Sequence, residues 1–161
     1  MQKISHYIRN LSFFYAFSIL ATALGSVYFL VWLIYHKLLG TRYDIIFVEN
    51  PHSFHQTYWG LVFGAIVIAS LLETVIFQVG GYHLLKKIKC LQKRKCYIVL
   101  IGGILFGLFH FFSLSYIIVT TITGTFFMYA YIIKRHKGGY WLVVLLHAFV
   151  NGLALFLEHF E

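Results

Sequence analysis

Charged residues are scarce in this chain, and acidic residues are the scarcest. Only 11% of its 161 residues are charged, and only five are Asp or Glu. Soluble globular proteins carry about 25% charged residues, so the composition excludes an ordinary soluble domain. Proline occurs once, at Pro51, and no repeat or low-complexity tract divides the sequence. We therefore expect one integral membrane domain over residues 1–161.

Hydrophobic residues make up 60% of the sequence and gather into five long apolar stretches. A membrane-spanning helix needs about 20 such residues, and each stretch reaches or approaches that length. The predicted fold class is an all-α, polytopic membrane protein with about five transmembrane helices. The third and fourth stretches are separated only by Ser113-Leu114-Ser115, which predicts a tight helical hairpin. The five stretches are residues 11–35, 60–85, 96–113, 114–133 and 140–158.

Positive charge is unevenly distributed along the chain. Eleven of the thirteen Lys and Arg residues fall on one side of a five-span arrangement, and only Lys37 and Arg42 fall on the other. Because cytoplasmic loops carry the excess of Lys and Arg, the N-terminus is predicted to be cytoplasmic. The basic clusters indicate topology and contact with anionic lipid headgroups, so we expect the bilayer as a partner and no nucleic acid.

The first stretch continues to Tyr35, which is too long for a signal-peptide core and predicts an uncleaved helix.

Cysteine and the one sizeable loop offer only weak candidates for metal binding. Cys90 and Cys96 fall in the basic segment between the second and third stretches. In a cytoplasmic loop they are expected to be reduced thiols, and two cysteines alone make a poor metal site. His52 and His55, in the loop of residues 36–57, are either a weak metal pair or simply exposed histidines.

Glu73 is the only acidic residue in the interior of an apolar stretch, since Glu158 is the last residue of the fifth. A charge at the centre of a membrane helix costs roughly 2.5–3.5 kcal/mol, so such residues usually face an interior cavity and have a function there. Two other stretches carry internal polar groups, His110 in one and the pair His147 and Asn151 in the other.

These four residues are predicted to share a depth. Counted from the nearest cytoplasmic basic residue, they lie 10–15 positions along their helices. At about 1.5 Å per residue, the distances from the basic rim are roughly 15–22 Å, near the middle of the bilayer. His147 and Asn151 are four residues apart and lie on one helical face. Gly103-xxx-Gly107, one turn before His110, predicts a face that lets helices approach closely.

One carboxylate, two imidazoles and an amide fit two hydrolytic mechanisms. In the first, Glu73 is a general base, His110 holds and polarises a water molecule, and His147 and Asn151 donate hydrogen bonds to the developing oxyanion. In the second, Glu73, His110 and His147 bind Zn²⁺, which activates the water. The chain lacks a His-Glu-x-x-His motif, and we favour the version without a metal. Proton or cation transport and interhelical hydrogen bonding are the alternatives to catalysis.

Three short motifs carry a family resemblance over roughly residues 60–155. In order, they are Glu73-Thr74 with Gln78, Phe106-xxx-His110 and His147-xxx-Asn151. This pattern resembles the CAAX-protease and bacteriocin-processing (CPBP) family, also called the abortive-infection family. That family is marked by Glu-Glu-xxx-Arg, then Phe-xxx-His, then His-xxx-Asn or His-xxx-Asp.

The resemblance implies an intramembrane endopeptidase of the cytoplasmic membrane of a bacterium, acting on a small peptide or a membrane-anchored protein. It implies that Glu73 and His110 activate water and that His147 and Asn151 stabilise the oxyanion. It also implies an alternative, a non-catalytic bacteriocin-immunity or defence protein, and a small cation or proton transporter remains a third. No cofactor is expected, with Zn²⁺ as the alternative.

Two positions depart from the family pattern. Thr74 stands where the family has its second glutamate, and Gln78 stands where it has arginine. Losing both members of an ion pair avoids stranding one buried charge. Two interpretations follow: a hydrogen bond between Thr74 and Gln78 keeps the orienting role, or the two replacements weaken the activity.

Overall fold

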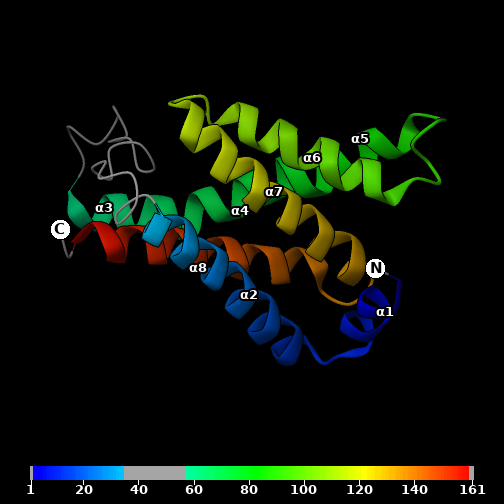
Figure 1. Ribbon diagram of the computed structural model, residues 1–161, viewed down its shortest axis with the longest axis horizontal. Coiled ribbons are helices and arrows are strands. Elements are labelled where there is room, and N and C mark those ends of the chain that lie inside the picture. Colours follow the sequence, from blue (N-terminus) through cyan, green and yellow to red (C-terminus); the bar gives the residue numbers. More distant parts are fainter. Residues whose placement is uncertain (1, 35–56, 160–161) are drawn as a thin grey trace.

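The computed structural model describes residues 2–34 and 57–159, and every element in these ranges is a helix. This confirms the predicted fold class. Lys37, Arg42, His52 and His55 lie outside the described residues. The separate helices are α1 (Gln2–Asn10), α2 (Phe13–Leu33), α6 (Lys95–Phe109), α7 (Leu114–Lys134) and α8 (Gly139–His159) (Figure 1).

The second apolar stretch forms one continuous composite helix in which α-helical and π-helical turns alternate. Its parts are α3 (Tyr58–Phe63), η4 (Gly64–Ala69), α4 (Ser70–Glu73), η5 (Thr74–Gly80) and α5 (Gly81–Lys87). Short π-helical segments inside α-helices occur frequently at functional sites. Glu73 is the last residue of the short α-helical part between the two π-helical parts.

Four helices in the described ranges are long and apolar enough to cross a membrane, and α6 is shorter. The third stretch was expected to be helical to residue 113, and that end was wrong. The chain leaves the helix at His110, where φ is −98° and ψ is 52°. The Ser113 hydroxyl then caps α7 by accepting a hydrogen bond from the backbone N–H of Tyr116 at 3.1 Å, which stabilises a new helix start. The four spans are Phe13–Val31, Gly64–Lys87, Leu114–Lys134 and Gly139–Leu157.

The predicted hairpin is formed by α6 and α7, which pack along most of their length. Glycine makes this contact possible. A Cβ atom at Gly103 would lie 2.6 Å from the backbone nitrogen of Thr125, and one at Gly107 would lie 2.8 Å from the carbonyl oxygen of Ile117. The small-xxx-small face therefore brings the two helix backbones together, as expected from the spacing.

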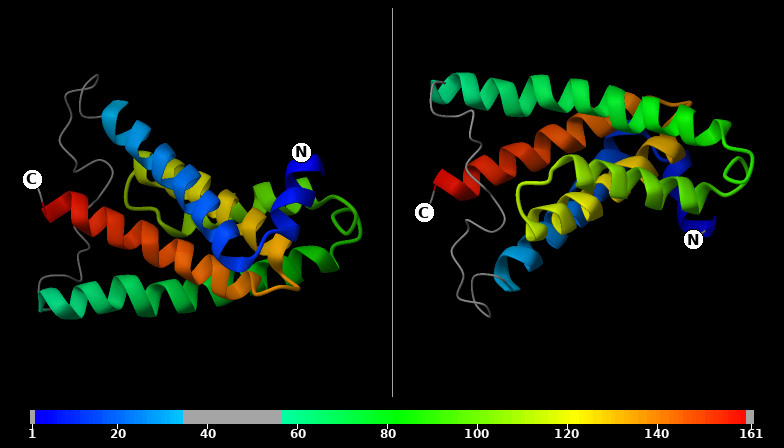
Figure 2. Two further views of the ribbon diagram at one scale, coloured as in Figure 1. Left: turned by 90° about the horizontal axis from the view of Figure 1, so that it is seen from below. Right: turned by 90° about the horizontal axis from the view of Figure 1, so that it is seen from above.

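α8 lies at the centre of the bundle. It packs against α7, α2 and the composite helix, and Figure 2 shows it between the composite helix and α2. Its buried side chains recur at three- and four-residue spacing, as on one face of a helix. They are Leu142, Val143, Val144, Leu146, His147 and Val150.

The basic segments collect at one end of the molecule. The N-terminal helix, the loop after α5 and the turn between α7 and α8 lie together there (Figure 1). The sequence analysis did not predict α1, which Lys134 holds in place. Lys134 is 1% exposed, and its ammonium group donates to the carbonyl oxygens of Arg9 at 3.4 Å and Leu11 at 2.5 Å. These carbonyls at the end of α1 have no helical partner of their own.

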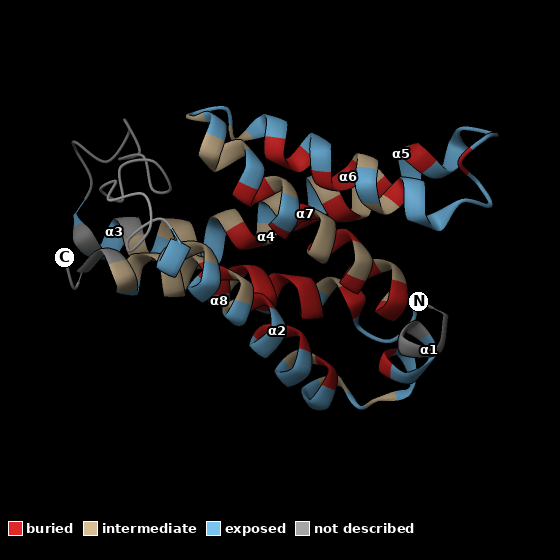
Figure 3. Cartoon of the chain, viewed as in Figure 1, coloured by how far each residue is buried: buried red, intermediate tan, exposed pale blue. Residues whose placement is uncertain are grey.

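The composite helix is polar on its buried side. Its buried positions include Ser70, Thr74, Gln78 and Tyr82, each four residues after the last, whereas exposed positions such as Leu72 are apolar (Figure 3). In lipid the apolar side is the expected outer one, and the polar side must face the protein. The side chains around Glu73 are therefore turned toward α7 and α8.

The α6–α7 contact can be tested with one methyl group. Gly107→Ala is expected to lower the melting temperature of the detergent-solubilised protein, because overpacking a close contact costs about 1–3 kcal/mol. Gly64→Ala is the matched control, since a Cβ there would meet nothing within 4 Å. Equal melting temperatures for the two variants would contradict the close backbone approach.

Candidate functional site

Three residues far apart in the sequence converge at the middle of the bundle. Oε2 of Glu73 lies 3.5 Å from Nε2 of His110 and 3.7 Å from Nε2 of His147. The carboxylate comes from the composite helix, the first imidazole from the end of α6 and the second from α8. The Glu73 side chain as a whole is 22% exposed, while the Oε2 atom that faces the imidazoles is buried.

His110 owes its orientation to Phe106. Its Nδ1 lies 2.8 Å from the carbonyl oxygen of Phe106. A carbonyl oxygen can only accept, so Nδ1 carries the hydrogen and Nε2 of the neutral ring has a free lone pair. Phe106 also packs its ring against both imidazoles, with centroids 4.6 Å from His110 and 5.7 Å from His147. Phe106 thus fixes which nitrogen of His110 faces Glu73.

His147 is enclosed by aromatic rings. It is 4% exposed, and its ring centroid lies 4.9 Å from that of Phe127. Its Nδ1 makes no hydrogen bond with the residues the structure describes. Since Nε2 faces the carboxylate and Nδ1 faces apolar surroundings, the neutral form with its hydrogen on Nε2 suits this position.

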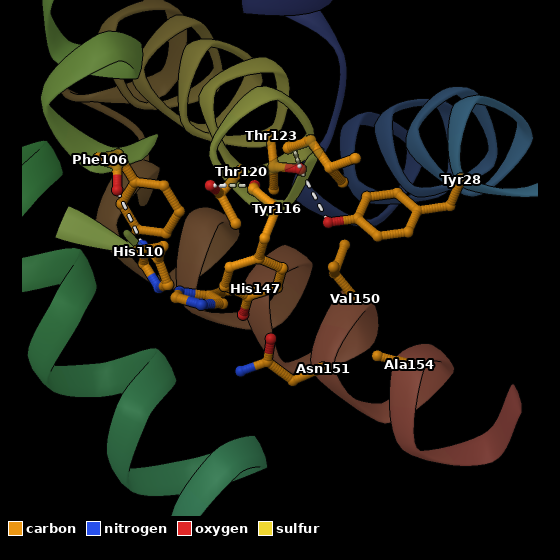
Figure 4. A pocket seen from close by; sticks show the side chains of 11 residues that line it. Tyr28, Phe106, His110, Tyr116, Thr120, Thr123, His147, Val150, Asn151 and Ala154 are labelled. Carbon is orange, nitrogen blue, oxygen red and sulfur yellow. Dashed lines mark hydrogen bonds between the residues drawn. The ribbon is translucent and has the colours of Figure 1, made fainter. Parts of the chain in front are cut away.

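Asn151 uses one of its two side-chain N–H groups in a bond to another helix. Its Nδ2 donates a hydrogen bond to the carbonyl oxygen of Ala65, in η4, at 2.7 Å. The side-chain nitrogen is thereby turned toward the composite helix, and the side-chain oxygen faces the pocket (Figure 4). Asn151 joins α8 to the helix that carries Glu73.

The expected hydrogen bond between Thr74 and Gln78 is absent, and that prediction was wrong. Both side chains are 0% exposed, and their polar atoms have no hydrogen-bond partner among the described residues. The two residues lie in η5, where backbone bonding runs from i to i+5 rather than i+4. The two side chains share the buried side of the composite helix without bonding to each other. Ser70, four residues before Thr74 on the buried side of the composite helix, also has a hydroxyl without a hydrogen-bond partner among the described residues.

A small pocket of about 70 Å³ adjoins the two histidines (Figure 4). It combines an apolar floor with several hydroxyl groups. The sequence indicated only the histidines, Phe106 and Asn151, because uncharged Tyr and Thr in apolar helices give no signal of their own. The lining residues are Tyr28, Phe106, His110, Tyr116, Val119, Thr120, Thr123, His147, Val150, Asn151 and Ala154.

A metal ion finds no ready set of ligands here. Within residues 2–34 and 57–159, no group of three or more His, Cys, Asp or Glu side chains is arranged to hold one. A catalytic zinc site needs three protein ligands. As placed, the side chains around Glu73 do not fit the Zn²⁺ alternative.

A bundle of apolar helices around a carboxylate and two imidazoles defines an integral membrane protein with a hydrolase-like site. The comparison with protein families is more specific, because the family described as type II CAAX prenyl endopeptidase Rce1-like matches residues 54–153. The chain belongs to this family of membrane proteases, which confirms the resemblance carried by the three motifs. No curated protein and no solved structure matches the chain.

The unpaired hydroxyl of Thr74 leads to a test of stability. Thr74→Val is expected to leave the melting temperature unchanged or to raise it, because an unsatisfied buried polar group costs about 1–3 kcal/mol and valine has the same shape. Thr123→Val is the matched control and should lower it, because the Thr123 hydroxyl is paired with that of Tyr28 at 2.8 Å. A clear loss of stability in Thr74→Val would mean that this hydroxyl has a partner in the folded protein.

Proposed function

We propose that this protein is an intramembrane endopeptidase in which Glu73 activates the water molecule that attacks a peptide bond. The observation that supports this most directly is the approach of two imidazole Nε2 atoms to one carboxylate oxygen, at 3.5 and 3.7 Å. That oxygen has no direct hydrogen bond to the described residues. Contacts of this length between polar groups are often bridged by water.

The proposed reaction assigns a separate task to each group. Glu73 removes one proton from the water molecule. The lone pair on Nε2 of His110 accepts a hydrogen bond from the other O–H group and so orients the water. The water oxygen bonds to the carbonyl carbon, and the carbonyl oxygen becomes an oxyanion that accepts a hydrogen bond from Nε2–H of His147. Glu73 then returns its proton to the leaving amine. The peptide and one water molecule become a carboxylic acid and an amine.

The proposed substrate is a small peptide or the tail of a membrane-anchored protein. The pocket of about 70 Å³ is smaller than the ~150 Å³ cavity that accommodates benzene in another protein. It has room for part of a peptide but not for a prenyl chain, which would have to lie outside it, in lipid. We propose the cytoplasmic membrane of a bacterium as the location, with the basic ends of the helices inside.

Replacing the carboxylate by an amide tests the general base. Glu73→Gln in proteoliposomes is expected to reduce peptide cleavage about 10²–10⁴-fold, the usual contribution of general acid–base catalysis. Cleavage is measured by mass spectrometry of a mixed peptide library, through the new termini formed. Glu158→Gln, the same chemical change near the end of α8, should cleave like the wild type. Full activity in Glu73→Gln would exclude this mechanism, and a wild type that binds peptides without cutting them would favour the immunity-type alternative.

Chelation tests the proposal that no metal takes part. Treatment with 1,10-phenanthroline or EDTA, followed by removal of the chelator, is expected to leave the cleavage rate unchanged, because the proposed steps use only side chains and water. The same rate assay serves as the measurement. A lost activity that returns on adding Zn²⁺ would overturn the metal-free mechanism in favour of metal-activated water.

A further inference from the structure

The pocket beside the histidines contains four hydroxyl-bearing residues, and hydrogen bonds within its wall occupy three of them. The Thr123 hydroxyl donates to the carbonyl oxygen of Val119 at 2.9 Å. Its hydrogen is thus committed, so in the 2.8 Å contact between the two hydroxyls Tyr28 must be the donor. The Thr120 hydroxyl donates to the carbonyl oxygen of Tyr116 at 2.6 Å. These three groups offer the pocket only acceptor lone pairs.

Tyr116 is the exception. Its hydroxyl makes no hydrogen bond with any residue in the described part of the chain, although its backbone nitrogen and carbonyl oxygen are both paired. The ring is held in the first turn of α7 by edge contacts, with centroids 5.7 Å from His110 and 5.8 Å from Phe112. Figure 4 shows its hydroxyl end directed past His147 toward Asn151. A donor held by ring packing, with no partner of its own, is available to a bound molecule.

One of the two side-chain N–H groups of Asn151 is given to Ala65, and its side-chain oxygen faces the pocket (Figure 4). The second N–H group is not committed. The hydrogen-bond donors beside the pocket thus include Nε2–H of His147, in the form assigned above, the second N–H of Asn151 and the hydroxyl of Tyr116.

We propose that the Tyr116 hydroxyl is a catalytic donor that binds the oxyanion of the tetrahedral intermediate together with His147, while one side-chain N–H of Asn151 holds α8 to the Glu73 helix. The assignment rests on the proposed endopeptidase function. It requires no proton transfer by Tyr116, since the hydroxyl only donates a hydrogen bond that strengthens as charge develops on the carbonyl oxygen. Two donors on one oxygen is the usual arrangement of an oxyanion hole.

Two tyrosine variants separate this role from a structural one. Tyr116→Phe keeps the ring and removes only the hydroxyl, and is expected to lower kcat about 10²–10³-fold with little change in KM, as for loss of one oxyanion donor. Tyr97→Phe makes the same chemical change at an exposed tyrosine of α6 that does not line the pocket, and should keep kcat within a few-fold. Replacing Tyr116 by 3,5-difluorotyrosine, a more acidic phenol, should preserve activity at a pH where that phenol is protonated.

The outcomes distinguish this assignment from the proposed function. An active Tyr116→Phe beside an inactive Glu73→Gln would overturn the role of Tyr116 alone. An active Glu73→Gln, or no cleavage by the wild type, would overturn the endopeptidase itself. Two outcomes would assign Tyr116 to packing instead. One is a Tyr116→Phe variant that loses activity through a higher KM. The other is a Tyr116→Phe variant with a lower melting temperature, together with an inactive difluorotyrosine variant.

Discussion

The approach of one carboxylate to two imidazoles is the constraint around which the bundle is organised. Glu73 would be costly on a lipid-facing surface, and His110 and His147 face it from two other helices at 3.5 and 3.7 Å. Each imidazole is held by aromatic packing against Phe106. Because the carboxylate is drawn inward, the composite helix presents its polar side to the protein and its apolar side to lipid. The positions of α6, α8 and the composite helix all follow from satisfying this one group.

Several buried polar groups of the bundle have no hydrogen-bond partner among the described residues. Ser70, Thr74 and Gln78 bring buried hydroxyl and amide groups to the helix that carries Glu73, and none has a hydrogen bond to the described residues. Side chains of α8 reach this helix at two places, through the bond from Asn151 to Ala65 and through the approach of His147 to Glu73. The imidazoles, in contrast, are packed against aromatic rings.

The sequence predicted the features that depend on hydrophobicity and spacing. The apolar stretches located the helices within a few residues. Ser113-Leu114-Ser115 predicted the α6–α7 hairpin, although the turn itself falls at residues 110–113 and Leu114 begins α7. The depth argument from basic residues placed Glu73, His110 and His147 at one level, where the structure has them in contact, while their chemical roles stay predictions. The family was recognisable from three motifs spread over separate helices.

Other features depend on contacts that local sequence does not encode. The π-helical turns on both sides of Glu73 were not predicted, and the expected hydrogen bond between Thr74 and Gln78 was wrong. The helix α1 is polar and short, and it is held by Lys134 from more than a hundred residues away. The direction of the Asn151 side chain is set by a backbone carbonyl on another helix, and Tyr28 and Tyr116 enter the pocket only because α2 and α7 pack beside it.

The length of α6 has a consequence for the surrounding lipid. A helix of 15 residues is about 22 Å long, whereas the hydrocarbon core of a bilayer is about 30 Å thick. Hydrophobic mismatch of this kind is relieved when the bilayer becomes thinner beside the short helix. His110 stands at the end of α6, so the thinned region adjoins Glu73 and the two imidazoles and shortens their path from the aqueous phase. In this way a protein embedded in lipid can bring buried polar groups close to bulk water without opening a wide channel through its core.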